Sequence, residues 1–219
     1  MEAMNFAMSY SGGKDSALAM YEMTQQGHTP VALITTVNAA DQRSWFHGIP
    51  TELLKAVAES LRVPLVFCEN GPTDYTEAFE KALKNAWEMG AEACAFGDID
   101  IADHQAWDEE RCASAGLVCV LPLWGKARDV VLNEMLAAGF KAVVKIVDKS
   151  KLDESFLGQT LTPALIEQIK AAGADACGEY GEYHTFVYDG PGFAHPVPFE
   201  LGEVVDLGTH AAIDLKPID

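Results

Sequence analysis

The sequence has few basic residues and no long apolar run. It contains 15 Lys and Arg against 33 Asp and Glu in 219 residues, a formal net charge of −18. Its average field therefore repels phosphate backbones, which argues against nucleic acid as a partner. No apolar run approaches the ~18 residues that a membrane-spanning helix needs, and the first residues lack the basic and apolar segments of a secretory signal. We expect a cytoplasmic protein without a membrane partner.

Several common motifs are also absent. The five cysteines are scattered, and no pair has the Cys-x-x-Cys spacing of a zinc ribbon or a thioredoxin-type site. Cys68, Cys94 and Cys119 lie in apolar, strand-like runs, whereas Cys177 adjoins a polar segment. The Walker A spacing Gly-x-x-x-x-Gly-Lys-Ser/Thr and the dinucleotide fingerprint Gly-x-Gly-x-x-Gly are both missing from the glycine-rich stretch near the start of the chain. These two nucleotide-binding loops are therefore excluded there.

That glycine-rich stretch is Ser11–Ser16, with the sequence SGGKDS, between an apolar run at residues 5–10 and a helical pattern. A turn of this kind lets the backbone approach a phosphate group, whose charge the N-terminus of the helix favours. Lys14 adds a positive charge, and Ser9, Ser11 and Ser16 add hydroxyl donors. Asp15 is expected to coordinate magnesium or to cap the helix. A plain strand–helix turn would explain neither the lysine nor the serines.

Strand-like apolar runs alternate with helical patterns up to about residue 147. Strands are expected at 31–37, 65–68, 93–96, 117–121 and 142–147, and helices at 50–61, 73–89, 103–115 and 126–138. This alternation predicts an α/β fold with a doubly wound, mostly parallel sheet of the Rossmann type. We expect a domain over residues 1–148 and a small C-terminal α+β subdomain over 149–219, with a helix at about 162–172 and paired strands at 199–207 and 209–215.

Polar residues follow three of the expected strands, at the edge of the sheet where ligands bind in such folds. Ser11–Ser16 follows the first strand, the apolar run at residues 5–10. Residues 38–41 follow the second strand, at 31–37, and residues 97–100 follow the fourth, at 93–96. Because the carboxyl ends of parallel strands share one edge, we expect Asn38 and Asp98 to lie near Ser11–Ser16.

A second cluster of polar residues, Gly-Glu-x-Gly-Glu, occupies residues 178–182 and is followed by His184. Glycines this dense disfavour a helix and predict a loop. Such a loop could hold Glu179 and Glu182 toward a cleft, where they could bind magnesium or an amine, or act as a general base. Taken alone, the stretch also reads as a solvated acidic turn that enters a strand.

The hexapeptide resembles the PP-loop of the N-type ATP pyrophosphatases, whose pattern is Ser-Gly-Gly-x-Asp-Ser. With the Gly-Glu-x-Gly-Glu motif, the chain resembles the ATP-binding domain of the diphthine–ammonia ligase family, a PP-loop group of the HUP-like, adenine nucleotide α-hydrolase-like superfamily. Further matches in the family's order are Trp45-Phe46-His47, Gly97-Asp98-Ile99, Pro122-Leu123-Trp124-Gly125 and Asp189-Gly190-Pro191. The sequence departs from the pattern at Tyr180, where the family often has Asn or Gly.

The resemblance implies an ATP-dependent amide ligase. A substrate carboxylate would attack the α-phosphorus of ATP to give an acyl-adenylate and pyrophosphate, and ammonia would then displace AMP. The implied cofactors are ATP and Mg²⁺, and the partners are ammonia and a carboxylate-bearing acceptor; a homodimer is expected for a chain of this size. ATP would be bound by Ser9, Ser11, Gly12, Gly13, Lys14, Asp15, Ser16, Asn38 and Asp98. Catalysis would use Lys14, Asp15, Glu179 and Glu182, magnesium would bind Asp15, and the substrate would contact His47, Trp124, Tyr180 and His184.

Two other functions stay open on the sequence. A PP-loop sulfur transferase would need a catalytic cysteine, for which Cys177 is the candidate, and a nucleotide sensor would bind ATP without turnover. Lys145 is unusual inside an apolar strand and could reach a phosphate or a buried carboxylate. His104 and Trp107 are expected at a solvated, capped helix start.

Overall fold

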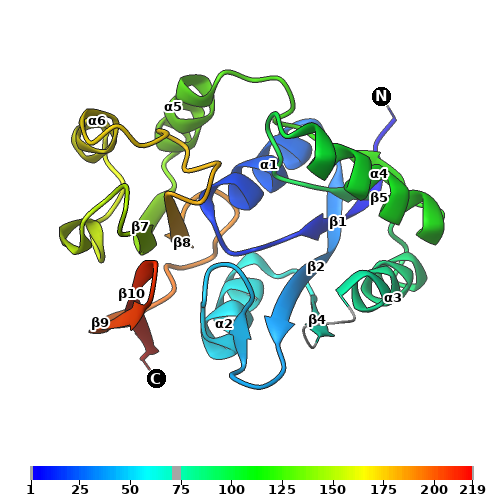
Figure 1. Cartoon of the computed structure of the whole chain (residues 1–219). Coiled ribbons are helices and arrows are strands. Elements are labelled where there is room, and N and C mark those ends of the chain that lie inside the picture. Colours follow the sequence, from blue (N-terminus) through cyan, green and yellow to red (C-terminus); the bar gives the residue numbers. More distant parts are fainter. Residues whose placement is uncertain (1, 71–74, 219) are drawn as a thin grey trace.

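The computed structural model describes residues 2–70 and 75–218, and in these residues the chain forms two sheets (Figure 1). The larger sheet has five parallel strands in the order β4-β2-β1-β5-β6, and the short β3 (Arg43–Ser44) pairs antiparallel with β2 at its edge. The parallel strands are β1 (Asn5–Ser9), β2 (Thr29–Asn38), β4 (Leu65–Asn70), β5 (Ala93–Ala95) and β6 (Val118–Val120).

The strand order places a switch point between β1 and β5. From β1 the chain runs outward to β2 and β4, then returns to β5 and β6 on the other side of β1. The segments that follow β1 and β5 therefore leave the sheet side by side and in opposite directions. In open α/β sheets this crevice is where ligands bind.

Side chains of β1 alternate between the two faces of the sheet, as the period of a strand requires. Phe6 and Met8 join the buried cluster under α1 (Lys14–Gln25), α2 (Thr51–Leu61) and α5 (Arg128–Ala138). Ala7 joins the cluster on the opposite face, under α3 (Tyr75–Glu88) and α4 (Ala102–Ala115). Figure 1 shows α3 and α4 together on one side of the sheet and α1 on the other. The predicted doubly wound α/β fold is confirmed.

The second sheet is antiparallel, in the order β8-β7-β10-β9. Its strands are β7 (Lys141–Asp148), β8 (Tyr183–Asp189), β9 (Phe199–Leu207) and β10 (His210–Pro217). The short helix η1 (Glu154–Phe156) and α6 (Pro163–Ala171) lie between β7 and β8. The expected pairing of residues 199–207 with 209–215 is confirmed.

The expectation that residues 142–147 continue the parallel sheet is wrong. The strand forms, but as β7 it pairs antiparallel with β8 and β10. A buried strand gives the same apolar run in either sheet, so the sequence could not distinguish its partners. The division at residue 148 stays a prediction, since one buried cluster includes Met8 of the first sheet and Val143 and Phe186 of the second. Residues 73 and 74 of the expected helix at 73–89 lie outside the described residues. None of the described helices is long and apolar enough to cross a membrane.

Candidate functional site

The loop between β1 and α1 needs glycine at two positions. Gly12 has a φ of +84°, in the left-handed region that other residues rarely adopt. A Cβ at Gly13 would lie 2.4 Å from Cε1 of His47, so this glycine lets the His47 ring pack directly on the loop. The Ser16 hydroxyl donates to the Gly13 carbonyl at 3.0 Å and lies 3.2 Å from the Ser11 hydroxyl. The hexapeptide is thereby a closed turn at the N-terminus of α1.

The second sheet holds this loop in place. The amide of Val187 in β8 donates to the Gly12 carbonyl at 2.9 Å, and the amide of Lys14 donates to the Thr185 hydroxyl at 3.0 Å. The Gly13 amide donates to the Ser11 hydroxyl at 3.2 Å. The amides of Gly13 and Lys14 are thus bonded to hydroxyl groups. Rotation of these hydroxyls would free both amides for a phosphate. The amides of Asp15 and Ser16 lie in the first helical turn, where no acceptor exists within the helix.

Lys14 and Asp15 form a partly buried ion pair. The Lys14 Nζ lies 2.7 Å from Asp15 Oδ2, and the lysine side chain is only 6% exposed. Burial, the largest single effect, would lower the pKa of Lys14, but the charges of Asp15 and of the neighbouring Tyr183, Cys177 and Glu179 together outweigh it and raise that pKa. Lys14 therefore stays cationic at neutral pH. The other carboxylate oxygen, Asp15 Oδ1, is buried and has no hydrogen-bond partner among residues 2–70 and 75–218.

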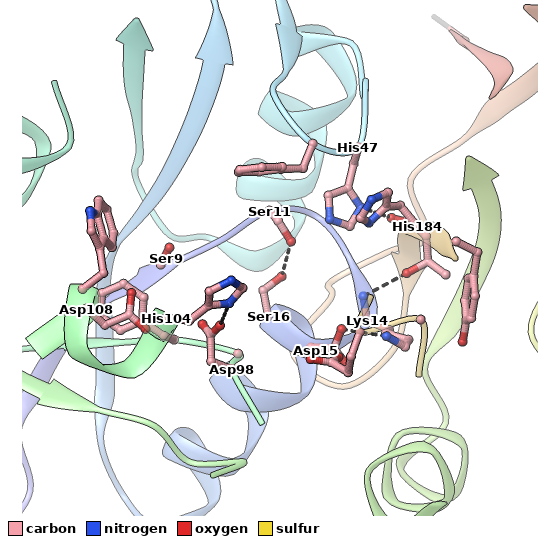
Figure 2. Close-up of a pocket in the computed structure, with 18 of the residues that line it drawn as sticks. Ser9, Ser11, Lys14, Asp15, Ser16, His47, Asp98, His104, Asp108 and His184 are labelled. Carbon is pink, nitrogen blue, oxygen red and sulfur yellow. Dashed lines mark hydrogen bonds and ion pairs between the residues drawn. The ribbon is translucent and has the colours of Figure 1, made fainter. Parts of the chain in front are cut away.

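A cavity of about 480 Å³ opens at the switch point of the sheet. Figure 2 shows Lys14, Asp15, His47 and His184 at one end, Asp98, His104 and Asp108 at the other, and Ser11 and Ser16 between them. The structure thus brings together most of the predicted site residues. The lining residues are Ser9, Ser11, Lys14, Asp15, Ser16, Phe46, His47, Tyr75, Phe96, Gly97, Asp98, His104, Trp107, Asp108, Gly178, Glu179, Tyr183, His184 and Thr185.

The end of the cavity away from Lys14 is aromatic. Trp107 in α4 stacks on Tyr75 in α3, with ring centroids 5.3 Å apart. Beside them, burial and the nearby Asp98 raise the pKa of Asp108 to about 9, so this carboxyl group is neutral and can donate a hydrogen bond. His104 binds Asp98 at 2.8 Å. The prediction of a solvated helix start is confirmed for His104, whose side chain is 57% exposed. The predicted side-chain cap is wrong, because the N-cap residue Ile101 has no polar side chain, and His104 and Trp107 also line the cavity.

The two glutamates of the Gly-Glu-x-Gly-Glu loop have different surroundings. Glu179 lines the cavity, where burial and the charge of Asp15 raise its pKa to about 7. Glu182 is buried and does not line this cavity; its oxygens accept from the amides of Asp175 at 3.3 Å and Tyr180 at 3.0 Å. Glu182 therefore holds the loop in shape, and Glu179 is the glutamate that faces the cavity.

Besides Glu182 and the loop glycines Gly12 and Gly13, the predicted residues Asn38, Trp124 and Tyr180 also lie outside the cavity lining. Asn38 ends β2 and lines a neighbouring cavity instead. Trp124 is half-buried outside the lining, and the exposed Tyr180 packs on Arg128, whose guanidinium carbon lies 4.7 Å from the ring centroid. Arg128 also binds Asp100 at 2.9 Å and forms an ion pair with Asp175. It therefore links the segment after β5 to the segment that leads into the Gly-Glu-x-Gly-Glu loop.

His47 and His184 lie at the Lys14 end of the cavity with ring centroids 4.7 Å apart. His47 Nδ1 lies 2.7 Å from the Thr185 carbonyl oxygen. Burial and the charges of Lys14 and Lys145 lower the pKa of His47 to about 4. Burial and His47 likewise lower the pKa of His184. Both rings are therefore neutral at pH 7 and can offer one donor and one acceptor each.

The donors fit a magnesium ion held jointly with a nucleotide. No group of three or more His, Cys, Asp or Glu side chains in residues 2–70 and 75–218 forms a metal site by itself. Magnesium often binds one or two carboxylates and completes its shell with phosphate oxygens and water. The partnerless Asp15 Oδ1 is the oxygen that such an ion would use.

Four residues at or beside the cavity were not predicted from the sequence: Tyr75, Asp108, Arg128 and Thr185. Arg128 carried a signal, because a basic residue at a helix N-terminus opposes the helix dipole and needs acidic partners. The other three gave none, because aromatic, carboxyl and hydroxyl side chains on helices and strands are ordinary, and only the fold brings them to the cavity.

Comparison with known proteins identifies relatives of the chain. The family model described as the diphthamide synthase N-terminal domain matches residues 4–119, and that of the diphthamide synthase C-terminal domain matches residues 128–206. The diphthine–ammonia ligases of Bos taurus and Homo sapiens are each 28% identical to the chain, over 98% of its length and 89% of theirs. The diphthine–ammonia ligase of Schizosaccharomyces pombe is 27% identical over 94% of the chain and 38% of its own length. A solved structure of a predicted tRNA methyltransferase subunit from Methanocaldococcus jannaschii aligns at 17% identity, over 84% of the chain and 96% of its own, with a TM-score of 0.43.

Proposed function

The chain belongs to the diphthamide synthase family, and from that membership we propose that it is an ATP-dependent ligase that joins ammonia to an acceptor carboxylate. The observation that supports this most strongly is the cavity at the switch point, which combines a glycine-rich loop, a helix N-terminus, a buried lysine and a carboxylate oxygen without a partner. These are the features that bind a magnesium-bound triphosphate.

ATP would lie along the cavity with its phosphates on Ser11–Ser16 and its base at the aromatic end. Phe96 and Trp107 offer apolar surface to the base, and the neutral Asp108 carboxyl group offers a donor for a ring nitrogen. A cavity of about 480 Å³ is of the size that such ligands occupy. Asp98 then lies at the same end of the cavity as the base (Figure 2).

The reaction would proceed in two displacements. A carboxylate oxygen of the acceptor forms a bond to the α-phosphorus as the bond from phosphorus to pyrophosphate breaks. The nitrogen of ammonia then attacks the carbonyl carbon, and the bond from this carbon to the AMP oxygen breaks. Lys14 and the N-terminus of α1 stabilise the charge that collects on the departing pyrophosphate.

Glu179 would accept the proton that the attacking ammonia loses. It lines the cavity, and its pKa of about 7 is matched to a general base at neutral pH. Glu182 would act through the loop, since its oxygens are bonded to backbone amides. When bound at Asp15, magnesium would neutralise phosphate charge.

The acceptor is proposed to be a carboxylate-bearing molecule. Its first candidate is diphthine, which appears in the names of the relatives. A sulfur transferase is disfavoured by Cys177. Its thiol donates to the Arg128 carbonyl at 3.2 Å, and burial raises its pKa to about 12, the opposite of what a reactive thiolate needs.

The test is to incubate the purified protein with α-labelled ATP, magnesium and ammonium, and to separate AMP from ADP. One reaction would contain a peptide bearing diphthine, another an extract of the source cells, and a third no acceptor. We expect AMP only with an acceptor, and its loss in Lys14→Ala but not in Lys149→Ala, a control on an exposed lysine paired with Asp206. ADP as the product would refute cleavage at the α-phosphorus. Tight ATP binding without any product would favour the sensor.

A further inference from the structure

A second cavity, of about 770 Å³, adjoins the first. It lies between the segment that ends β2 and the antiparallel sheet, and Phe46 and His184 line both cavities. Neither the nucleotide nor the proposed chemistry uses this second space. The lining residues that matter here are Arg43, Trp45, Lys145, Val205, Leu207 and Asp214.

Lys145 is the unusual residue of this cavity. It belongs to β7 and is 2% exposed, yet no ion pair in residues 2–70 and 75–218 includes it. The Asp214 carboxylate, which also lines the cavity, binds Arg43 at 2.9 Å instead. An ammonium group buried without a partner is costly. Burial and the charge of Arg43 accordingly lower the pKa of Lys145 to about 8.

The position of Lys145 relates the two cavities. Phe46 and His184 line both cavities, so the two spaces share a wall. The ring of His184 lies 4.7 Å from that of His47, tilted by 54°, at the end of the first cavity that Lys14 and Asp15 also line (Figure 2). A ligand beside Lys145 in the second cavity therefore adjoins that end of the first cavity.

We propose that the second cavity binds the acceptor, and that the Lys145 ammonium pairs with the carboxylate of the acceptor and directs it past His184 toward the nucleotide. This assignment rests on the proposed ligase function, which requires a carboxylate to reach the α-phosphorus. An anion supplies the partner that Lys145 lacks. Trp45, Val205 and Leu207 supply apolar surface for the rest of the acceptor.

Nuclear magnetic resonance of the full chain with isotope-labelled lysine tests the site without turnover. The Lys145 side-chain signal would be assigned from its loss in Lys145→Arg, and its pKa measured with acetate, glutarate, a diphthine peptide, inorganic phosphate or chloride at matched ionic strength. We expect the carboxylate probes to raise the pKa from about 8 toward 10.5, while Lys141 on the same strand, paired with Asp189, does not respond. No response to any carboxylate, or a response to phosphate or chloride alone, overturns the assignment.

Kinetics of two variants separate this site from the ligase function. Lys145→Met should raise the acceptor KM about tenfold or more, the loss expected for a charge-assisted hydrogen bond, and should leave ATP affinity unchanged. Lys141→Met is the matched control and should change neither. If AMP forms and Lys145→Met keeps the acceptor KM, the site is refuted and the function stands. If Lys145 responds to carboxylates but no acceptor yields AMP, the function is refuted and the binding site stands.

Discussion

Gly97, in the segment after β5, lies against the first turn of α1. A Cβ at this position would be 2.9 Å from both the Asp15 carbonyl carbon and the Ser16 amide nitrogen, about 0.5 Å closer than the 3.4 Å at which ordinary contact begins. Both neighbours are backbone atoms and cannot swing aside as a side chain would. Gly97→Ala must therefore push this segment away from the start of α1.

Overpacking of this kind costs about 1–3 kcal/mol in the free energy of unfolding, or roughly 2–12 °C in Tm for a chain of this length. The displaced atoms belong to the Ser11–Ser16 loop, where the phosphates of ATP are proposed to bind. We therefore expect the dissociation constant for ATP to rise by at least about tenfold, since small misplacements at such sites are costly.

Gly116→Ala supplies the matched control. Gly116 caps the C-terminus of α4 with a φ of +72° and open space around its Cβ position, away from the cavity. Alanine there should cost about 1–2 kcal/mol through backbone strain alone. Calorimetric melting and titration with a non-hydrolysable ATP analogue would be compared for both variants. Equal ATP affinity in Gly97→Ala and Gly116→Ala, at similar losses of stability, would refute the close packing of Gly97 on the loop.

Three further predictions follow from the site. At a constant concentration of free ammonia, AMP formation should rise with pH through about 7, because Glu179 with its raised pKa must lose its proton to act as a base; Glu179→Gln should abolish this limb of the pH profile, and an unchanged profile would remove Glu179 as the base. Glu182→Ala should lower the free energy of unfolding by about 1–3 kcal/mol in urea titrations, because the amides of Asp175 and Tyr180 lose their acceptor; an unaltered midpoint would contradict its role in the loop. Cys177→Ser should retain AMP formation, since a serine hydroxyl can still donate to the Arg128 carbonyl, and loss of turnover in a folded variant would revive the sulfur-transfer reading.

Local patterns carried the prediction of the fold. The alternation of apolar strands and amphipathic helices determines the parallel sheet, and the position of Ser11–Ser16 after β1 follows from it. The partners of β7 did not follow, because sheet membership depends on contacts with β8 and β10, far away in sequence. A buried strand carries no local mark of the sheet to which it belongs.

The candidate site was predicted where its residues share one loop or one strand end. Asp98 lies in the cavity with Lys14 and Asp15 because β5 and β1 are neighbours. Asn38 does not, because β2 is longer than β1 and ends beside the second cavity. The different surroundings of Glu179 and Glu182 depend on how the loop turns, which the spacing of two carboxylates does not specify.

The hydrogen bonds from β8 to the Ser11–Ser16 loop have a consequence for biosynthesis. The loop is translated before β8, but the Lys14 amide donates to a residue 171 positions later, and the Gly12 carbonyl accepts from the amide of Val187. A nascent or prematurely terminated chain that lacks these residues has an incomplete loop, however well its first sheet folds. Nucleotide capture thereby marks a chain that has been translated past β8, and truncated products would not sequester ATP.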